Sequence, residues 1–303
     1  MYRKIMGFLE AWKESEHRKP LILQGARQVG KTYSILEFGR THYENVAYFN
    51  FETNPKLNKT FEENISPDYL IPILSHIAGQ TIVTEKTLIV FDEVQLCERA
   101  LTSLKYFCEN APDYHIIVAG SLLGVAVNRA KFSFPVGKVD MKTLYPMDME
   151  EFMLALGEDD LVEQIKKCFQ TDTPLPSALH DAAMQLYRQY LVVGGMPECV
   201  MQFAETKDYI LVRHTQDTIL ASYLNDMSKY NNLNEIKKTR LAYDNITVQL
   251  SKKNTRFQYK LIKKGGRASE FEKAIEWLCL SGIVSQVYKV EQIKKPLENY
   301  RDI

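Results

Sequence analysis

Residues 25–32 read Gly-Ala-Arg-Gln-Val-Gly-Lys-Thr, two spaced glycines followed by a lysine and a threonine. The octet fits the G-x-x-x-x-G-K-[ST] phosphate-binding pattern without a mismatch. A short apolar run at 20–24, Pro-Leu-Ile-Leu-Gln, precedes it, and a helix-like run at 33–38, Tyr-Ser-Ile-Leu-Glu-Phe, follows it. Strand, glycine loop and helix in this order are the context that a phosphate-binding loop requires.

The residue types in this loop each have a physical reason. Gly25 and Gly30 lack a Cβ, so the chain can curl and turn backbone N–H groups toward phosphate oxygens. The helix that follows adds the positive end of its dipole. Lys31 is predicted to reach the outer phosphates of ATP, and the Thr32 hydroxyl to bind Mg²⁺. The residues expected to hold the nucleotide are Gly25, Ala26, Arg27, Gln28, Val29, Gly30, Lys31, Thr32 and Tyr33.

A second motif follows at 88–93, Leu-Ile-Val-Phe-Asp-Glu, where an apolar strand ends in two carboxylates. Ligands of parallel sheets bind at this carboxyl end of the strands. We expect Asp92 to hold Mg²⁺ through water and Glu93 to polarise the attacking water. A small-molecule kinase does not need such a base, so the pair favours hydrolysis. The alternative is a strand that ends by chance in a solvated Asp-Glu.

The composition is that of an ordinary globular protein. The chain has 303 residues, 45% of them apolar and 25% charged, enough for two or three domains. Five scattered cysteines without a C-x-x-C pair indicate reduced thiols and a cytoplasmic protein. The charged N-terminus is typical of an amphipathic helix and not of a signal peptide, and no apolar run is long enough to span a membrane.

The formal net charge is zero, but residues 229–303 carry 16 Lys and Arg against 8 Asp and Glu. The densest basic stretch, 252–267, has no acidic residue and contains Phe257 and Tyr259. Such a stripe is typical of a nucleic-acid contact, so DNA is a candidate partner of 229–303. A solvated surface, a contact with the acidic half of the chain and a contact with a protein partner remain open.

Strands and helices alternate through residue 150, which predicts a mostly parallel sheet covered on both faces. The expected strands are 20–24, 45–51, 87–92, 115–120 and 138–144, and the expected helices 31–42, 56–79 with a break, and 98–111. The strand at 45–51 lies between the two motif strands in sequence, which is the layout of ATPases with a catalytic Glu. Ser121 follows the fourth strand, where it is expected to sense the γ-phosphate or to hold the attacking water; a helix cap is the alternative.

Beyond Met147 the pattern becomes helical. We expect helices at 148–156, 178–192, 198–204, 209–229, 239–264 and 268–280, a loop at 158–177 and a strand at 283–290. The final helix, turn and strand resemble part of a winged-helix module. The predicted domains are an ATPase core at 1–150, a helical lid at 151–230 and the winged-helix-like module at 231–303.

Six motifs in order resemble a bacterial and archaeal family of AAA-type P-loop ATPases with an AAA_14-like domain and a C-terminal DUF4143-type domain. They are Gly25–Thr32, Leu88–Gln95, Ala119–Ser121, Phe134–Lys138, Leu144–Phe152 and Tyr190–Glu198. The resemblance implies an ATPase core, a helical lid and a winged helix. It assigns phosphate binding to Lys31, Mg²⁺ to Thr32 and Asp92, water activation to Glu93 and sensing to Ser121.

The sequence departs from this family in two places. The chain ends about where the DUF4143-type domain is expected to begin, so we expect that domain to be largely absent. Gly137-Lys138 stands where related sequences tend to have Gly-Arg. AAA-type proteins often place there an arginine finger that acts in trans, which makes Lys138 a candidate catalytic residue, although lysine lacks the planar fork of arginine.

These observations favour a Mg²⁺-dependent ATPase that acts as a nucleotide-driven conformational switch rather than in metabolism, and they allow a homo-oligomer. A DNA-binding regulatory module whose nucleotide is mostly structural is the first alternative. A kinase acting on a small acceptor is the second, and Glu93 speaks against it.

Overall fold

The computed structural model describes residues 1–120, 134–230, 233–253, 256–290 and 293–294. The chain divides into two compact units, Met1–Asn225 and Asp226–Ile303. The boundary at 225 falls near the predicted start of the C-terminal module. The further division of the first unit into a core and a lid stays a prediction.

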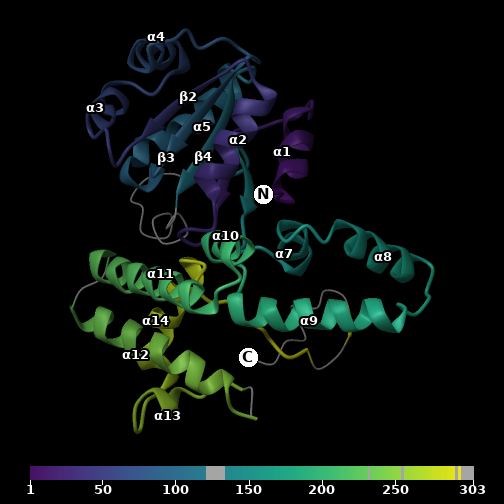
Figure 1. The fold of residues 1–303 in the computed structure, drawn as a ribbon. Coiled ribbons are helices and arrows are strands. Elements are labelled where there is room, and N and C mark those ends of the chain that lie inside the picture. Colours follow the sequence, from purple (N-terminus) through teal and green to yellow (C-terminus); the bar gives the residue numbers. More distant parts are fainter. Residues whose placement is uncertain (121–133, 231–232, 254–255, 291–292, 295–303) are drawn as a thin grey trace. The chain divides into compact units, whose positions relative to one another are not determined.

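The first unit is built on a five-stranded, fully parallel sheet, which confirms the predicted α/β class (Figure 1). Its strands are β1 (Leu21–Gln24), β2 (Asn45–Asn50), β3 (Thr87–Asp92), β4 (His115–Gly120) and β5 (Asp140–Thr143). Their order across the sheet is β2-β3-β4-β1-β5. β4 therefore lies between the strand that precedes the glycine loop and the strand that ends in Asp92, whereas β2, which lies between these two strands in sequence, is at the edge of the sheet.

Helices cover both faces of this sheet because its central strands are apolar on both sides. The helices are α1 (Ile5–Lys13), α2 (Lys31–His42), α3 (Lys56–Glu63), α4 (Pro67–Ala78) and α5 (Glu98–Asn110). Alternate residues of β3 face opposite ways: Ile89 and Phe91 join a core cluster with α3, α4 and α5. On the other face Leu88 lies against Gly39 of α2, where a Cβ on the glycine would come within 3.1 Å of the leucine.

The rest of the first unit is helical. It contains α7 (Met149–Ala155), α8 (Asp159–Gln170), α9 (Ser177–Val193), α10 (Pro197–Thr206) and most of α11 (Tyr209–Tyr230). Asp148 begins α7 through a capping box with Glu151, in which each side chain binds the other residue's backbone N–H. This local motif explains why the start of α7 was predicted correctly.

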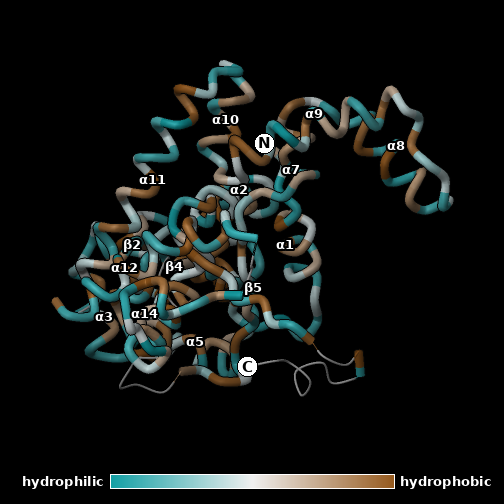
Figure 2. The backbone as a smooth tube through the Cα atoms, turned by 90° about the horizontal axis from the view of Figure 1, so that it is seen from below, coloured by the Kyte–Doolittle hydropathy of each residue, from teal (hydrophilic) through white to brown (hydrophobic). Residues whose placement is uncertain are grey.

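The prediction of a loop at 158–177 is wrong, because most of this segment forms α8. Leu161 and Val162 are buried on one side of this helix, and hydrophobic and hydrophilic residues alternate along it (Figure 2). Asp159 and Asp160 lie in the first turn of this helix, where the helix dipole favours negative charge.

The second unit contains α12 (Leu233–Leu250), α13 (Tyr259–Ile262) and α14 (Ala268–Leu280). α12 packs against α14, and Ala242, Phe271 and Leu278 are buried. Two predictions are wrong here. The single helix at 239–264 ends at Leu250, and residues 283–289 form no strand, so the described part of the unit has no wing.

Within the described residues, no helix combines the length and apolar character needed to cross a membrane.

Candidate nucleotide site

The glycine loop and the acidic pair Asp92-Glu93 lie at the carboxyl edge of the sheet. β1 ends at Gln24, which pairs in register with Gly120 at the end of β4, and β3 ends at Asp92. The loop at 25–30 runs from β1 into α2 at this edge. Parallel pairing therefore brings the glycine loop and the acidic motif together although they are far apart in sequence.

Positive φ angles shape the loop. Gly25 has φ +151° and Gly30 has φ +88°, both outside the range that ordinary residues prefer. A Cβ on Gly25 would lie 2.2 Å from the backbone oxygen of Leu144, which leaves no room for any other residue. Gln28 also has a positive φ, +64°, which a non-glycine residue keeps only where surrounding contacts fix the backbone.

Lys31 begins α2 and is buried, with 8% of its surface exposed. Its ammonium donates to the carbonyl oxygens of Gly25 at 2.9 Å and Ala26 at 2.8 Å. Burial lowers the pKa of Lys31 to about 8, although the carboxylates of Glu93 and Asp92 act in the opposite direction. The lysine thus lies folded against the loop that it belongs to.

Asp92 is the centre of a small polar cluster. Its Oδ2 accepts hydrogen bonds from the Thr32 hydroxyl at 2.9 Å and from the Tyr48 hydroxyl at 2.7 Å. Its Oδ1 accepts the backbone N–H of Glu93 at 2.9 Å. Asn50 donates to the Tyr48 oxygen at 3.2 Å. Burial raises the pKa of Tyr48 to about 12, so its hydroxyl remains a donor at neutral pH.

Glu93 follows the strand in a left-handed backbone conformation, with φ +52°. A non-glycine residue in this region is uncommon and carries strain. Burial raises the pKa of Glu93, and a hydrogen bond donated by the Gln95 amide opposes that rise. A carboxylate in partly buried surroundings beside Lys31 and Asp92 is suited to accept a proton from water.

Two of the predicted residues, Tyr33 and Lys138, are not brought into this cluster, and a third, Ser121, lies outside the described residues. Tyr33 is 59% exposed on α2. Lys138 precedes β5 and therefore lies at the opposite, amino edge of the sheet. Its ammonium pairs with the Glu109 carboxylate of α5 at 3.0 Å. Lys138 does not join the site of its own chain, and its predicted role as a finger in the site of a neighbouring copy stays a prediction.

Sequence reasoning missed three residues around the loop. Tyr48 reaches Asp92 from the neighbouring strand. Arg3, just before α1, donates to the carbonyl of Val29 at 2.9 Å, and Tyr223 of α11 donates to the carbonyl of Arg27 at 3.0 Å. A charged residue next to the predicted N-terminal helix was a weak signal that could have been followed, but nothing local marks either tyrosine.

The donor set fits a nucleotide with Mg²⁺. Helix α2 directs its N-terminus at the loop, and Lys31 supplies a cation beside it. The Thr32 hydroxyl gives its hydrogen to Asp92, which leaves its oxygen lone pairs for a hard cation. Among the described residues, no three His, Cys, Asp or Glu side chains form a metal cluster, so the ion would depend on Thr32, Asp92 and phosphate oxygens.

Comparison with protein families places the loop in a known domain. Residues 17–153 match the model of an AAA domain, AAA_14, which supports an AAA-type ATPase domain at this end of the chain. Residues 184–300 match a domain of unknown function, DUF8612. The C-terminal segment is therefore of the DUF8612 type, which corrects the expected relation to DUF4143. No curated protein matches the sequence.

Solved structures resemble this chain at low sequence identity. The Aeropyrum pernix ORC2 protein is 13% identical over 94% of this chain and 87% of that chain, with a TM-score of 0.51. Thermotoga maritima RuvB gives 13% identity over 94% and 88%, with a TM-score of 0.39. C. elegans PCH-2 is 12% identical over 68% of this chain, with a TM-score of 0.37. The match covers 63% of the PCH-2 chain, which is less than two thirds of its length.

The fold is that of the AAA+ P-loop ATPases. At these identities the likeness extends to the fold alone, and the roles of individual residues rest on the geometry of the site.

Proposed function

We propose that the protein binds ATP with Mg²⁺ and hydrolyses it, and that hydrolysis switches the conformation of the helical segments that follow the sheet. The observation that carries this proposal is the cluster of Lys31, Thr32, Asp92 and Glu93 at one edge of the sheet. These residues come from two motifs that chain folding has joined. The ORC2 structure with a similar fold is of ADPNP and ADP complexes, which is in keeping with the proposal.

Each residue has a distinct part. Lys31 leaves the carbonyls of Gly25 and Ala26 and binds the outer phosphates, where its charge interacts more strongly than with neutral oxygens. Thr32 and Asp92 hold Mg²⁺, which neutralises phosphate charge during transfer. Glu93 orients the attacking water and accepts its proton.

The switch follows from the connection between the loop and α7. The backbone N–H of Leu144 donates to the carbonyl of Gln24 at 2.8 Å, and Gly25 lies directly against the Leu144 carbonyl. Residues 144–148 lead into α7 and the helices that follow. A change in the loop on binding or loss of the γ-phosphate therefore acts on the first residues of the helical segment.

Binding of ATP measured by isothermal titration, with Mg²⁺ and with EDTA, tests the proposal. It predicts saturable binding at one site that is stronger with Mg²⁺, and release of ADP without any added acceptor. The absence of binding would reject the site. Binding with ADP formation only in the presence of a small acceptor would favour a kinase.

A second function, DNA binding, is favoured by one observation in the second unit. The seven basic residues between 252 and 267 are all exposed: Lys252, Lys253, Arg256, Lys260, Lys263, Lys264 and Arg267. Of these, Lys263 pairs with Glu270 at 3.1 Å.

We expect the variant in which Lys252, Lys253, Lys263 and Lys264 are all replaced by Ala to bind duplex DNA more weakly. The log–log salt slope should flatten by roughly 0.9 for each phosphate that the variant no longer binds. No binding by the parent at low salt would reject this function.

A further inference from the structure

Arg3 is a buried charged residue that the proposed chemistry does not use. Only 4% of its surface is exposed. Its guanidinium donates in three directions: Nε to the Glu151 carboxylate at 3.1 Å, Nη1 to the Val29 carbonyl at 2.9 Å and Nη2 to the Tyr145 carbonyl at 2.8 Å. One side chain thus joins the phosphate loop, the segment after β5 and helix α7.

Stability alone is a poor explanation for this arrangement. The side chains of Arg3 and Glu151 are 5% and 6% exposed, and a buried ion pair often stabilises a fold less than apolar residues of similar volume. What arginine offers is direction, because its planar fork fixes where each N–H points. The groups that the fork orients therefore indicate what Arg3 does.

These groups include a peptide of the phosphate loop. In a planar trans peptide the C=O and the following N–H point in opposite directions. Arg3 holds the Val29 carbonyl, so the N–H of Gly30 points away from the arginine. Tyr223 holds the Arg27 carbonyl, so the N–H of Gln28 points away from the tyrosine in the same manner. The Arg27–Gln28 and Val29–Gly30 peptides are thus each held by a side chain from outside the loop, and their N–H groups are left to bind an anion.

The loop needs such support because one of its residues is strained: Gln28, which is not a glycine, has φ +64°. Strained backbone persists only where surrounding contacts determine it. Arg3 also lies beside Gly30, where a Cβ on the glycine would be 3.5 Å from Nη1.

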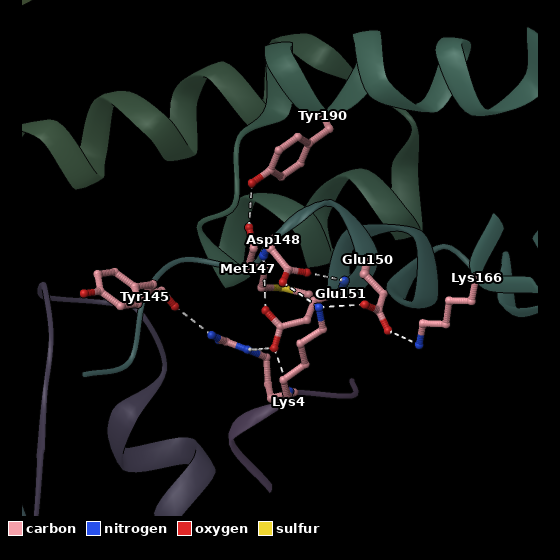
Figure 3. Close-up of polar contacts among 9 residues, drawn as sticks. Lys4, Tyr145, Met147, Asp148, Glu150, Glu151, Lys166 and Tyr190 are labelled. Carbon is pink, nitrogen blue, oxygen red and sulfur yellow. Dashed lines mark hydrogen bonds and ion pairs between the residues drawn. The ribbon is translucent and has the colours of Figure 1, made fainter. Parts of the chain in front are cut away.

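Glu151, the carboxylate partner of Arg3, lies in a dense polar network (Figure 3). Besides Arg3, Glu151 accepts the backbone N–H of Lys4 at 2.7 Å and that of Asp148 at 3.1 Å. Tyr190 of α9 donates to the Met147 carbonyl at 2.8 Å. Because the Glu151 carboxylate is fixed in this way, the fork of Arg3 has one orientation toward the loop.

We propose that Arg3 is a positioning residue of the nucleotide site, which holds the Val29–Gly30 peptide in the orientation that binds ATP phosphates, with Tyr223 acting in the same way on Arg27–Gln28. This inference rests on the proposed function. Its effect is on nucleotide affinity, because the hydrogen bonds of Arg3 go to the loop, Tyr145 and Glu151 and not to Asp92 or Glu93, the groups assigned to Mg²⁺ and hydrolysis.

The test compares Arg3→Lys with Lys4→Ala in the full chain. Lysine keeps the charge beside Glu151, but its single nitrogen cannot occupy the three positions from which Nε, Nη1 and Nη2 donate to Glu151, Val29 and Tyr145. Lys4→Ala removes ion pairs to Asp148 at 2.7 Å and Glu150 at 2.6 Å in the same network without touching the loop. Titration with ATP and Mg²⁺, thermal unfolding without nucleotide and kcat at saturating ATP are measured on each variant.

We expect Arg3→Lys to weaken ATP binding by roughly 10- to 100-fold, the range of a lost charge-assisted hydrogen bond with its consequences for the loop. KM should rise in parallel while kcat at saturation changes less than about threefold. Lys4→Ala should lower thermal stability but leave ATP affinity within about twofold of the parent. A merely structural Arg3 would give equal affinity in both variants, and this result would overturn the proposal.

Tyr223→Phe gives a second test, which can still be carried out if the Arg3 variants do not fold. It removes one hydroxyl and should weaken ATP binding by about three- to tenfold, as expected for a neutral hydrogen bond. Unchanged affinity in Tyr223→Phe, with Arg3→Lys unfolded or unchanged, overturns the inference. If the parent binds no ATP, the proposed function fails as well. If the parent binds ATP and Lys31→Ala does not, the function stands whatever Arg3→Lys does.

Discussion

The Thr32 hydroxyl donates a hydrogen bond of 2.9 Å to the Asp92 carboxylate, across 60 residues of sequence. This bond joins the end of the glycine loop to the end of β3. It exists because parallel pairing sets the carboxyl ends of β1, β4 and β3 along one edge. The proposed Mg²⁺ site is thus a product of the sheet order and of two short motifs.

Lys31→Ala should lose ATP affinity by about 100-fold or more, because the phosphates lose a buried cation that lies beside the loop. Lys86→Ala is a matched control, since Lys86 is an exposed lysine paired with Glu44 at 2.8 Å. Isothermal titration with ATP and Mg²⁺ measures both variants. Parent-like binding by Lys31→Ala would show that the phosphates bind elsewhere.

Asp92→Asn should reduce the part of ATP affinity that depends on Mg²⁺. The substitution keeps an oxygen near Thr32 and Tyr48 but removes the charge that attracts the cation. Titrations with Mg²⁺ and with EDTA should therefore differ less in the variant than in the parent. An unchanged difference would remove Asp92 from the metal site.

Gly25→Ala should damage both the loop and the fold. Its Cβ would meet the Leu144 oxygen at 2.2 Å, and backbone must shift to relieve the contact. Gly79→Ala is the control, because Gly79 also has a positive φ, +66°, with open space around a Cβ. We expect Gly25→Ala to unfold more easily than the control by about 1–3 kcal/mol and to bind ATP weakly. Equal stability of the two variants in urea would contradict the close approach of the loop to Leu144.

His115 should make the fold sensitive to acid. Burial and the nearby charges of Arg18 and Lys13 lower the pKa of His115 from 6.5 to about 4, and the Tyr43 hydroxyl lies 2.7 Å from its Nδ1. Between these values the unfolded chain binds a proton that the folded chain does not. Stability is therefore lost as the pH falls from 6.5 toward 4, by about 2–3 kcal/mol in total once partial solvent screening is allowed for.

His115→Gln cannot titrate and supplies the comparison. The difference in unfolding free energy between parent and variant should shrink as the pH is lowered from about 7 to 4.5, because only the parent bears the protonation cost. Urea unfolding at several pH values measures it. A constant difference would mean that His115 has the same pKa in both states.

The sequence was sufficient where the signal was local. The glycine loop, the strand before Asp92 and the capping box of α7 each lie within a few residues, so their conformations follow from residue type and spacing. The alternation of strands and helices also predicted the parallel sheet correctly.

Contacts between distant segments could not be predicted in this way. Tyr48 and Tyr223 reach their partners across 44 and 196 residues, and neither stands in a recognisable pattern. The alternating run at 283–290 has the period of a strand, but a strand also needs a neighbour to pair with, and within the described residues 283–289 have none. α8 was missed because an acidic start and two prolines, Pro174 and Pro176, suggested a loop, but the helix ends at Gln170, before both prolines.

The most direct test of the proposed function measures ATP binding and turnover together on the parent and on Glu93→Gln. The amide keeps the shape of the side chain but cannot accept the proton of the attacking water. The proposed mechanism predicts ATP affinity within a few-fold of the parent and turnover lower by about 10²- to 10⁴-fold. Hydrolysis by Glu93→Gln at the parent rate would contradict it.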